Sequence, residues 1–268
     1  MTGLQETSAL ATAALVFTGE MYGVQADHLA VLLGASARRA GGTVTRWRAA
    51  GWAESARLGP GPRWVWLTRA GLAACGLPYA AGTPGLARLG HLRAVTAVRL
   101  ALAATPDYER AGAYWRSERR LRARSGGRLG LREHFPDGEV HWPDASGLAW
   151  AGECWAIEAE LTPKTLARTT AIMREVLTRT GDYGCPAGQA HVPGGRPRHA
   201  RVIYLCSPAA RPVVTRARAA IGDLGRRVEI RMLPQGAALP PAGALPPAGA
   251  LPPAGVLPPA ADSPGGRR

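Results

Sequence analysis

The stretches HFPDG at 134–138 and WAIEAELTPK at 155–164 decide the fold of the second half of this chain. Side chains alternate between the two faces of a strand, so Glu158 and Glu160 share one face. The residues between and around them are apolar and share the opposite face. The second stretch is therefore expected to be a strand with a polar face and an apolar face.

The first stretch is expected to pair with the second in an antiparallel hairpin of 137–142 and 153–161, around a loop near 147. Asp137 then lies roughly opposite Glu158, and Glu160 is on the same face. Clusters of carboxylate oxygens suit Mg²⁺ or Mn²⁺, which are hard cations. The sequence therefore predicts a site for Mg²⁺ or Mn²⁺ formed by Asp137, Glu158 and Glu160.

Lys164 follows Glu160 by four residues and is the only lysine in the chain; all other basic side chains, histidine apart, are arginine. Usage rich in Arg, Ala, Gly and Pro indicates a GC-rich genome that disfavours lysine codons. An ammonium group is a compact point charge that can lose its proton when desolvated, which a guanidinium cannot readily do. A lone lysine beside this acidic strand therefore points to a chemical role.

An Asp, a gap of about twenty residues, and Glu-x-(acidic or Lys) on a strand before a helix resemble the PD-(D/E)xK nuclease-like superfamily. Pro136-Asp137 and Glu158-Ala159-Glu160 carry the resemblance, which covers roughly 107–234. The chain departs from the commonest pattern at Glu160, where lysine is usual, and Lys164 could supply the missing charge. The resemblance implies an Mg²⁺-dependent endodeoxyribonuclease.

The same resemblance implies roles for single residues. Asp137 and Glu158 would be metal ligands, and Glu160 would be a third ligand or would hold a metal-bound water. Lys164 would stabilise charge on the phosphate or orient the nucleophile. Glu118 matches an acidic residue that some relatives carry on the first core helix, and Arg168 could hold a phosphate.

Other interpretations of these residues remain open. The two glutamates could be the solvated face of an edge strand with Lys164 as a surface partner, or the site could be degenerate and not cleave. Asp144 belongs to a second Pro-Asp pair, but it falls in the expected hairpin loop. His134, Asp137 and His141 could be metal ligands, although a zinc site would need a fourth partner.

The first 105 residues favour a winged helix-turn-helix. Helices are expected at 7–22, 24–33 and 37–50, followed by strands at 52–58 and 63–67 around a Gly-Pro-Gly-Pro turn. Arginines of the third helix and of the wing are the expected contacts to duplex DNA: Arg38, Arg39, Arg46, Arg48 and Arg63. A solvated helix face or a protein-binding module would also account for this charge.

Bulk composition agrees with a nucleic-acid partner. The formal net charge is +14 with a pI near 11.0, which favours an anionic partner. No apolar run approaches the roughly 20 residues of a membrane span, and no secretory signal is visible at the N-terminus. The four cysteines are scattered without a CxxC pair, so a cytoplasmic protein with free thiols and no membrane partner is expected.

The expected fold class is mixed α/β: a winged helix with a bridging helix (1–105), a restriction-endonuclease-like domain (106–234) and a Pro-rich tail (235–268). The tail repeats Leu-Pro-Pro-Ala-Gly-Ala, a composition typical of a disordered spacer. The element order expected within 106–234 is α-β-β-β-α-β-α-β: a helix at 108–124, strands at 128–133, 137–142 and 153–161, a helix at 163–180 capped by Thr162-Pro163, a strand at 200–206, a helix at 208–222 and a strand at 227–233.

The whole arrangement resembles the actinobacterial replication-relaxation proteins found with plasmids and integrative elements. The residues that carry this resemblance are Trp64-Val65-Trp66-Leu67-Thr68-Arg69-Ala70-Gly71 and the stretch 157–164. It implies a role in replication, mobilisation or control of such an element, with double-stranded DNA and other replication or mobilisation proteins as partners. A metal-dependent endonuclease and a non-catalytic DNA-binding regulator or replication accessory protein both fit it.

Overall fold

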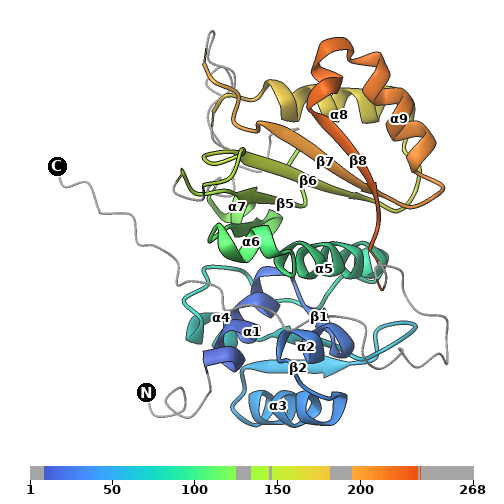
Figure 1. The fold of residues 1–268 in the computed structure, drawn as a ribbon. Coiled ribbons are helices and arrows are strands. Elements are labelled where there is room, and N and C mark those ends of the chain that lie inside the picture. The colour runs from blue at the N-terminus through green and yellow to red at the C-terminus, as the bar shows by residue number, and fades with distance from the viewer. Residues whose placement is uncertain (1–8, 125–133, 145–146, 182–194, 235, 237–268) are drawn as a thin grey trace.

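The computed structural model describes residues 9–124, 134–144, 147–181, 195–234 and 236. Within them the chain is a mixed α/β protein with two β-sheets. Figure 1 shows the smaller sheet and its helices at one end, the larger sheet and its helices at the other, and one long helix between them. The expected Pro-rich tail lies almost entirely outside the described residues.

The N-terminal part is a helical unit closed by a small antiparallel sheet with strand order β1-β3-β2. Its elements are α1 (Ala9–Glu20), β1 (Val24–Gln25), α2 (Ala26–Leu32), α3 (Ala37–Ala49), β2 (Ala53–Ala56), β3 (Trp64–Leu67) and α4 (Arg69–Ala74). Val24 and Gln25, expected to begin the second helix, instead pair with Val65 and Trp64 of β3. Their pairing gives the sheet its third strand.

Helix α3 is fixed by its cap and its apolar face. The side chain of Ser36 accepts a hydrogen bond from the backbone N–H of Arg39, as an N-cap does. Ala40, Val44 and Trp47 are buried at helical spacing, which orients the helix on the core. Trp47, Trp64 and Trp66 of this part are buried core residues.

Helix α5 (Leu89–Ala103) follows the short helix η1 (Leu86–Arg88) and lies between the two sheets (Figure 1). Most of its residues are buried, and its apolar side chains join one core with those of both sheets. Arg93 forms an ion pair with Asp27 of α2 (2.7 Å). None of the described helices is both long and apolar enough to cross a membrane.

The larger sheet has the strand order β4-β5-β6-β7-β8. The pairs β4/β5 and β5/β6 are antiparallel, and the pairs β6/β7 and β7/β8 are parallel. Helices α8 and α9 pack on one face, and α5 packs on the other. The elements are α6 (Pro106–Arg110), β4 (Tyr114–Ser117), α7 (Glu118–Arg124), β5 (Gly138–His141), β6 (Cys154–Glu160), α8 (Leu166–Thr178), β7 (Arg201–Cys206), α9 (Arg211–Ala220), η3 (Gly222–Arg227) and β8 (Val228–Met232).

The expected hairpin is confirmed, but the expected helix at 108–124 is wrong. That segment is divided into α6, β4 and α7, and Gly112 turns the chain after α6 with a φ of 63°. Strand β4 is the neighbour of β5, because Trp115 and Ser117 alternate into the interior and the Trp115 ring packs over Gly138. The strand expected at 128–133 lies outside the described residues.

The start of α8 also differs from the expectation. Thr165 is the N-cap, and its side chain accepts a hydrogen bond from the backbone N–H of Arg168. Thr162 and Pro163 therefore do not cap the helix. Lys164 therefore precedes the helix and does not belong to it, contrary to the helix expected at 163–180.

Candidate functional site

The hairpin β5–β6 brings Asp137 and Glu158 together. Gly138 pairs with Ile157, which places the preceding Asp137 across from Glu158. The Oδ2 atom of Asp137 accepts a hydrogen bond from the backbone N–H of Ala159 (2.8 Å). Glu158 and Glu160 are both buried on the face that packs against α8. The predicted acidic face therefore exists in the structure.

Each of the three carboxylates has a basic partner from a different segment. His91 Nε2, from α5, lies 2.7 Å from Asp137 Oδ1. His134 Nε2 lies 2.6 Å from Glu158 Oε1. Lys164 Nζ donates to Glu160 Oε1. Each carboxylate of the acidic face thus has a basic side chain of the chain itself as its partner.

The electrostatics of the Asp137–His91 pair favour the charged forms. Burial opposes the Asp137 carboxylate, but the charge and hydrogen bond of His91, the backbone N–H of Ala159 and the charge of His134 together outweigh burial and lower the pKa of Asp137. Burial likewise opposes the His91 imidazolium, and Asp137 outweighs it and raises the pKa of His91. His134 behaves in the same way, because Glu158 raises its pKa against the effect of burial.

The Glu160–Lys164 pair differs, because burial dominates on the acidic partner. Burial raises the pKa of Glu160, and the hydrogen bond from Lys164 only partly offsets this. For Lys164, burial favours the neutral amine, but Glu160 outweighs it and raises the pKa above 10.5. Lys164 is therefore an ammonium cation near neutral pH, suited to stabilising negative charge and unsuited to acting as a base.

Tyr204 lies under this acidic face, and the sequence did not single it out. It is the register partner of Glu158 in the parallel pair β6/β7, and its side chain is fully buried. Its hydroxyl has no hydrogen-bond partner within the described residues. Burial and then the charge of Glu158 raise its pKa well above 10. A buried hydroxyl without a partner is costly, so this one is suited to contact a group bound at the face.

The carboxylate oxygens of Asp137, Glu158 and Glu160 are ligands of the kind that Mg²⁺ or Mn²⁺ prefers. The negative charges of all three residues also raise the pKa of the Tyr204 hydroxyl. However, the ligand atoms of these three carboxylates do not all lie within 4.8 Å of one another. Among the described residues, a different group of three meets that criterion. A cation at the acidic face would compete with the histidine and lysine partners described above.

Glu118 has a different place from the one expected, because it opens α7 after β4. Its carboxylate accepts from Arg88 (2.9 Å) and from Arg122 (2.8 Å). Only its backbone N–H reaches Asp137, donating to the carbonyl oxygen at 3.2 Å. The structure therefore links Glu118 to the site through the backbone and gives its side chain two arginine partners.

A surface cavity of about 370 Å³ lies beside the His134–Glu158 pair. Arg122 and Arg168 line it together with His134 and Glu175. The side chain of Arg168 is exposed there. Guanidinium groups match phosphate geometry through paired N–H donors, so this cavity is suited to a phosphate near the carboxylates.

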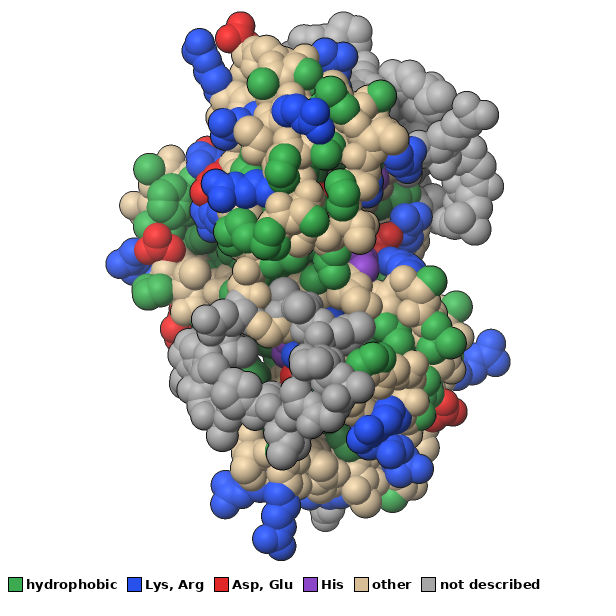
Figure 2. All heavy atoms as spheres, turned by 90° about the vertical axis from the view of Figure 1, so that its right-hand side faces the viewer, with side chains coloured by type: hydrophobic (Ala, Val, Ile, Leu, Met, Phe, Trp, Pro, Cys, Tyr) green, Lys and Arg blue, Asp and Glu red, His purple; other side chains and the backbone are tan. Residues whose placement is uncertain are grey.

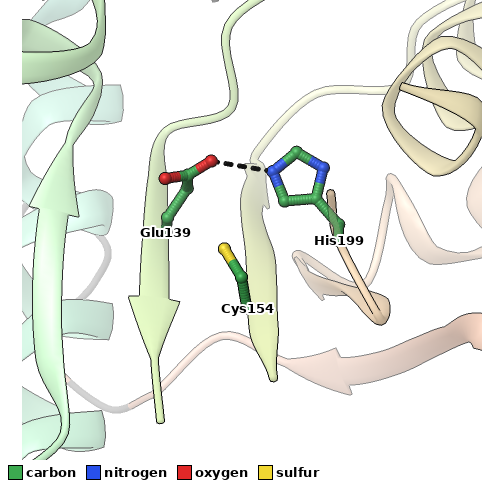
Figure 3. Close-up of side chains that lie close together, drawn as sticks. All are labelled: Glu139, Cys154 and His199. Carbon is green, nitrogen blue, oxygen red and sulfur yellow. Dashed lines mark hydrogen bonds and ion pairs between the residues drawn. The ribbon is translucent and has the colours of Figure 1, made fainter. Parts of the chain in front are cut away.

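A second polar cluster lies further along the same face of the hairpin (Figure 3). His199 Nε2 lies 2.9 Å from Glu139 Oε1, and Arg198 Nε donates to the same oxygen at 2.6 Å. His141 Nε2 lies 2.9 Å from Glu139 Oε2 and 3.6 Å from Cys154 Sγ. His141 therefore belongs with Glu139, and the alternative that grouped it with His134 and Asp137 is wrong.

The arginines expected to contact DNA are exposed. Arg38, Arg39, Arg46 and Arg48 extend from α3 on the side away from its buried face. Arg63 is exposed beside the β2–β3 loop, and its Nη2 donates to the carbonyl oxygen of Ser55 (2.9 Å). Helix α3 lies at the end of the molecule remote from the larger sheet (Figure 1), and basic side chains project from that end in Figure 2.

Comparisons with known proteins add little to this description. No family model matches the chain, and no curated protein matches it either. A solved structure titled "PigF with SAH" is similar at 17% identity, covers 87% of this chain and has a TM-score of 0.18. The match spans 64% of that structure's length, and at this TM-score the likeness carries no argument about fold or function.

The His91–Asp137 pair predicts a pH-dependent contribution to stability. The raised pKa of His91 means that its contribution is fully present below 6.5 and is lost as the pH rises through the folded-state pKa. The lowered pKa of Asp137 means that its contribution is present above 3.8 and is lost as the pH falls through the folded-state pKa. His91→Gln should therefore cost more unfolding free energy at about pH 5.5 than at about pH 9, measured by urea denaturation.

His28 provides a control with the opposite sign. Burial lowers its pKa to about 4, so the folded protein holds it neutral. A histidine whose pKa is lowered by folding contributes less to the unfolding free energy as the pH falls. His28→Gln should therefore lose less unfolding free energy at about pH 5.5 than at about pH 9. If the loss of unfolding free energy changed with pH in the same direction in both variants, His91 and Asp137 would not form a charged pair.

Proposed function

We propose that this chain is a DNA-binding protein of a plasmid or integrative element, with a nuclease-like site that cleaves phosphodiester bonds with Mg²⁺ or Mn²⁺. The observation that carries the proposal is the position of Asp137 across from Glu158 in the β5–β6 hairpin. Glu160 follows on the same face, and Lys164 contacts it. Two acidic strand positions, a third carboxylate and a fixed ammonium group are the parts that such chemistry requires.

The order of elements supports both halves of this proposal. Three helices and a small antiparallel sheet ending in the β2–β3 hairpin are what a winged helix requires, with α3 as its recognition helix. In the second half, three antiparallel strands, a helix, a parallel strand, a helix and a last parallel strand follow the order of a nuclease-like core. The short α7 between β4 and β5 is an addition to the expected order.

In this proposal Asp137 and Glu158 would hold the divalent cation, and Glu160 would be a third ligand or would hold a water molecule. When bound, the cation would polarise the phosphate and lower the pKa of a water molecule. Lys164 keeps its charge and stabilises the negative charge that develops on the phosphate. Arg122 and Arg168 orient a backbone phosphate in the cavity beside His134.

A non-catalytic DNA-binding regulator or replication accessory protein is the second candidate. It is favoured by the basic side chain that already pairs with each carboxylate: His91 with Asp137, His134 with Glu158 and Lys164 with Glu160. A buried acidic face that is balanced in this way can be structural. Incubating the full chain with supercoiled and linear DNA in Mg²⁺ or Mn²⁺ separates the candidates, because only the first produces nicked or linear product.

The winged-helix part of the proposal predicts that Arg38→Ala combined with Arg46→Ala weakens binding to duplex DNA. Both side chains are exposed on α3, so their loss removes charge without disturbing the core. If each contacts one phosphate, the slope of log K against log salt should become less steep by about 0.9 per arginine. Fluorescence anisotropy at several salt concentrations measures both effects.

The matched control is Arg216→Ala combined with Arg226→Ala, which removes the same charge from exposed positions on α9 and η3. These elements lie at the opposite end of the molecule from α3 (Figure 1). An equal loss of affinity in both double variants would mean that binding follows net charge alone, and that α3 is not the recognition helix.

A further inference from the structure

The cluster around Glu139 combines three side-chain types that bind transition metals. One ligand atom each from Glu139, Cys154 and His199 lies within 4.8 Å of the other two, as Figure 3 illustrates. Glu139 and His199 are fully buried, and Cys154 is partly buried. The cluster is separate from the acidic face, because none of its three members contacts His91, His134 or Lys164 in the described interactions.

The hydrogen bonds of His199 leave a place for a cation. Nδ1 lies 3.1 Å from the carbonyl oxygen of Val176, so the proton of a neutral ring belongs on Nδ1. Nε2 then presents its lone pair to Glu139 Oε1 at 2.9 Å, where two acceptors face each other. Either the ring carries a second proton or another cation joins the two atoms. A histidine that ligates a metal through one nitrogen commonly donates its other N–H to a carbonyl.

The contacts of Glu139 are compatible with a ligand role. Arg198 donates through Nε to Oε1 (2.6 Å) and through Nη2 to Oε2 (3.0 Å), which uses about one lone pair on each oxygen. The second lone pair of Oε1 faces His199, and that of Oε2 faces His141. Arg198 therefore orients the carboxylate, and a cation at Oε1 would have both this oxygen and His199 Nε2 as ligands.

The site also has a route to solvent. Cys154 and Arg198 line a surface cavity of about 470 Å³ together with Glu153 and Arg227. Cys154 thus borders solvent at this cavity, while burial raises the pKa of its thiol well above 9. Metal binding to a thiol releases its proton, so affinity at this site should increase with pH.

From these observations we propose that Glu139, Cys154 and His199 bind a transition metal ion of the Zn²⁺ type, with a water molecule as the fourth ligand. Thiolate and imidazole ligands select Zn²⁺ and related ions over Mg²⁺. One carboxylate and one thiolate bring two negative charges to a divalent cation, beside the positive charge of Arg198. The site binds its ion independently of the cation proposed for Asp137 and Glu158, and it braces strands β5 and β6 against the segment that leads into β7.

Cobalt provides the test, because Co²⁺ occupies zinc sites and a thiolate ligand gives it a charge-transfer band in the near ultraviolet. Metal-free full-length protein titrated with Co²⁺ should develop this band up to one equivalent, and Zn²⁺ should remove it. The band should be lost in Cys154→Ser. It should persist in Cys75→Ser, in Cys185→Ser and in Glu158→Gln, which alters only the acidic face.

The absence of a band at stoichiometric Co²⁺ would overturn the proposal, and so would a band that survives Cys154→Ser. If Cys154→Ser does not fold, alkylation of the wild-type protein decides the matter. Zn²⁺ should slow iodoacetamide labelling of Cys154 while leaving that of Cys75 unchanged, as mapped by mass spectrometry. Equal labelling of Cys154 with and without Zn²⁺ would rule out the site.

Discussion

Asp137→Asn and Glu158→Gln are each expected to abolish Mg²⁺- or Mn²⁺-dependent cleavage of supercoiled DNA and to leave DNA binding unchanged. The reason is that an amide lacks the charge that holds a divalent cation, whereas we propose that DNA is bound by α3, at the other end of the molecule. The amides keep the shape of the buried side chains, and Asp137→Asn can still accept from the backbone N–H of Ala159. Conversion to nicked and linear forms on agarose gels measures the loss.

Asp144→Asn is the control for this experiment. Asp144 belongs to the other Pro-Asp pair and lies beyond β5, with its carboxylate packed near Gly152. The Asp144→Asn variant should cleave DNA at the wild-type rate. Unchanged cleavage by Glu158→Gln would place the active site elsewhere. If the wild type cuts nothing with either metal but binds DNA, the non-catalytic candidate stands.

Lys164→Ala is expected to slow cleavage by about 10²–10³-fold, the usual effect of removing one group that stabilises charge in the transition state. Its ammonium contacts the buried carboxylate of Glu160, so its removal should also lower the melting temperature, because that carboxylate loses its ion-pair partner. Single-turnover rates at saturating Mg²⁺, beside thermal melts, separate a role in the reaction from a role in folding.

Lys164→Arg sharpens this test, because it keeps the charge and changes its shape. The guanidinium is larger and planar, so it should recover little of the rate. Arg168→Ala is the matched comparison: it removes an exposed charge from the neighbouring cavity and should mainly weaken substrate binding. Full activity in Lys164→Ala would leave the lone lysine without a part in the reaction.

The acidic hairpin was predictable because its information is local. The alternation of Glu158 and Glu160 with apolar residues fixes which face each takes, and the Pro-Asp pair fixes where the partner strand begins. The partner of Asp137 was not predictable in this way. His91 is 46 residues away and reaches Asp137 only because α5 packs against β6. No spacing in the sequence encodes that contact.

The features that were predicted wrongly or missed from the sequence also have physical explanations. The segment 108–124 is rich in helix-forming residues, yet Trp115 and Ser117 are held in a strand by pairing with β5. Tertiary pairing overrode local propensity there. The cluster of Glu139, Cys154 and His199 was missed because its members come from three segments without a motif. Only the sheet register and the approach to β7 bring them together.

The single lysine makes it possible to follow binding at the acidic face by NMR. Reductive methylation with ¹³C-formaldehyde would label Lys164 and the α-amino group and no other side chain. The dimethylamino group of Lys164, which gives the NMR signal, would then lie beside Glu160 on the acidic face. Its chemical shift would register a cation or a phosphate arriving there, so one NMR signal would report occupancy of the site directly, whether or not any bond is cut.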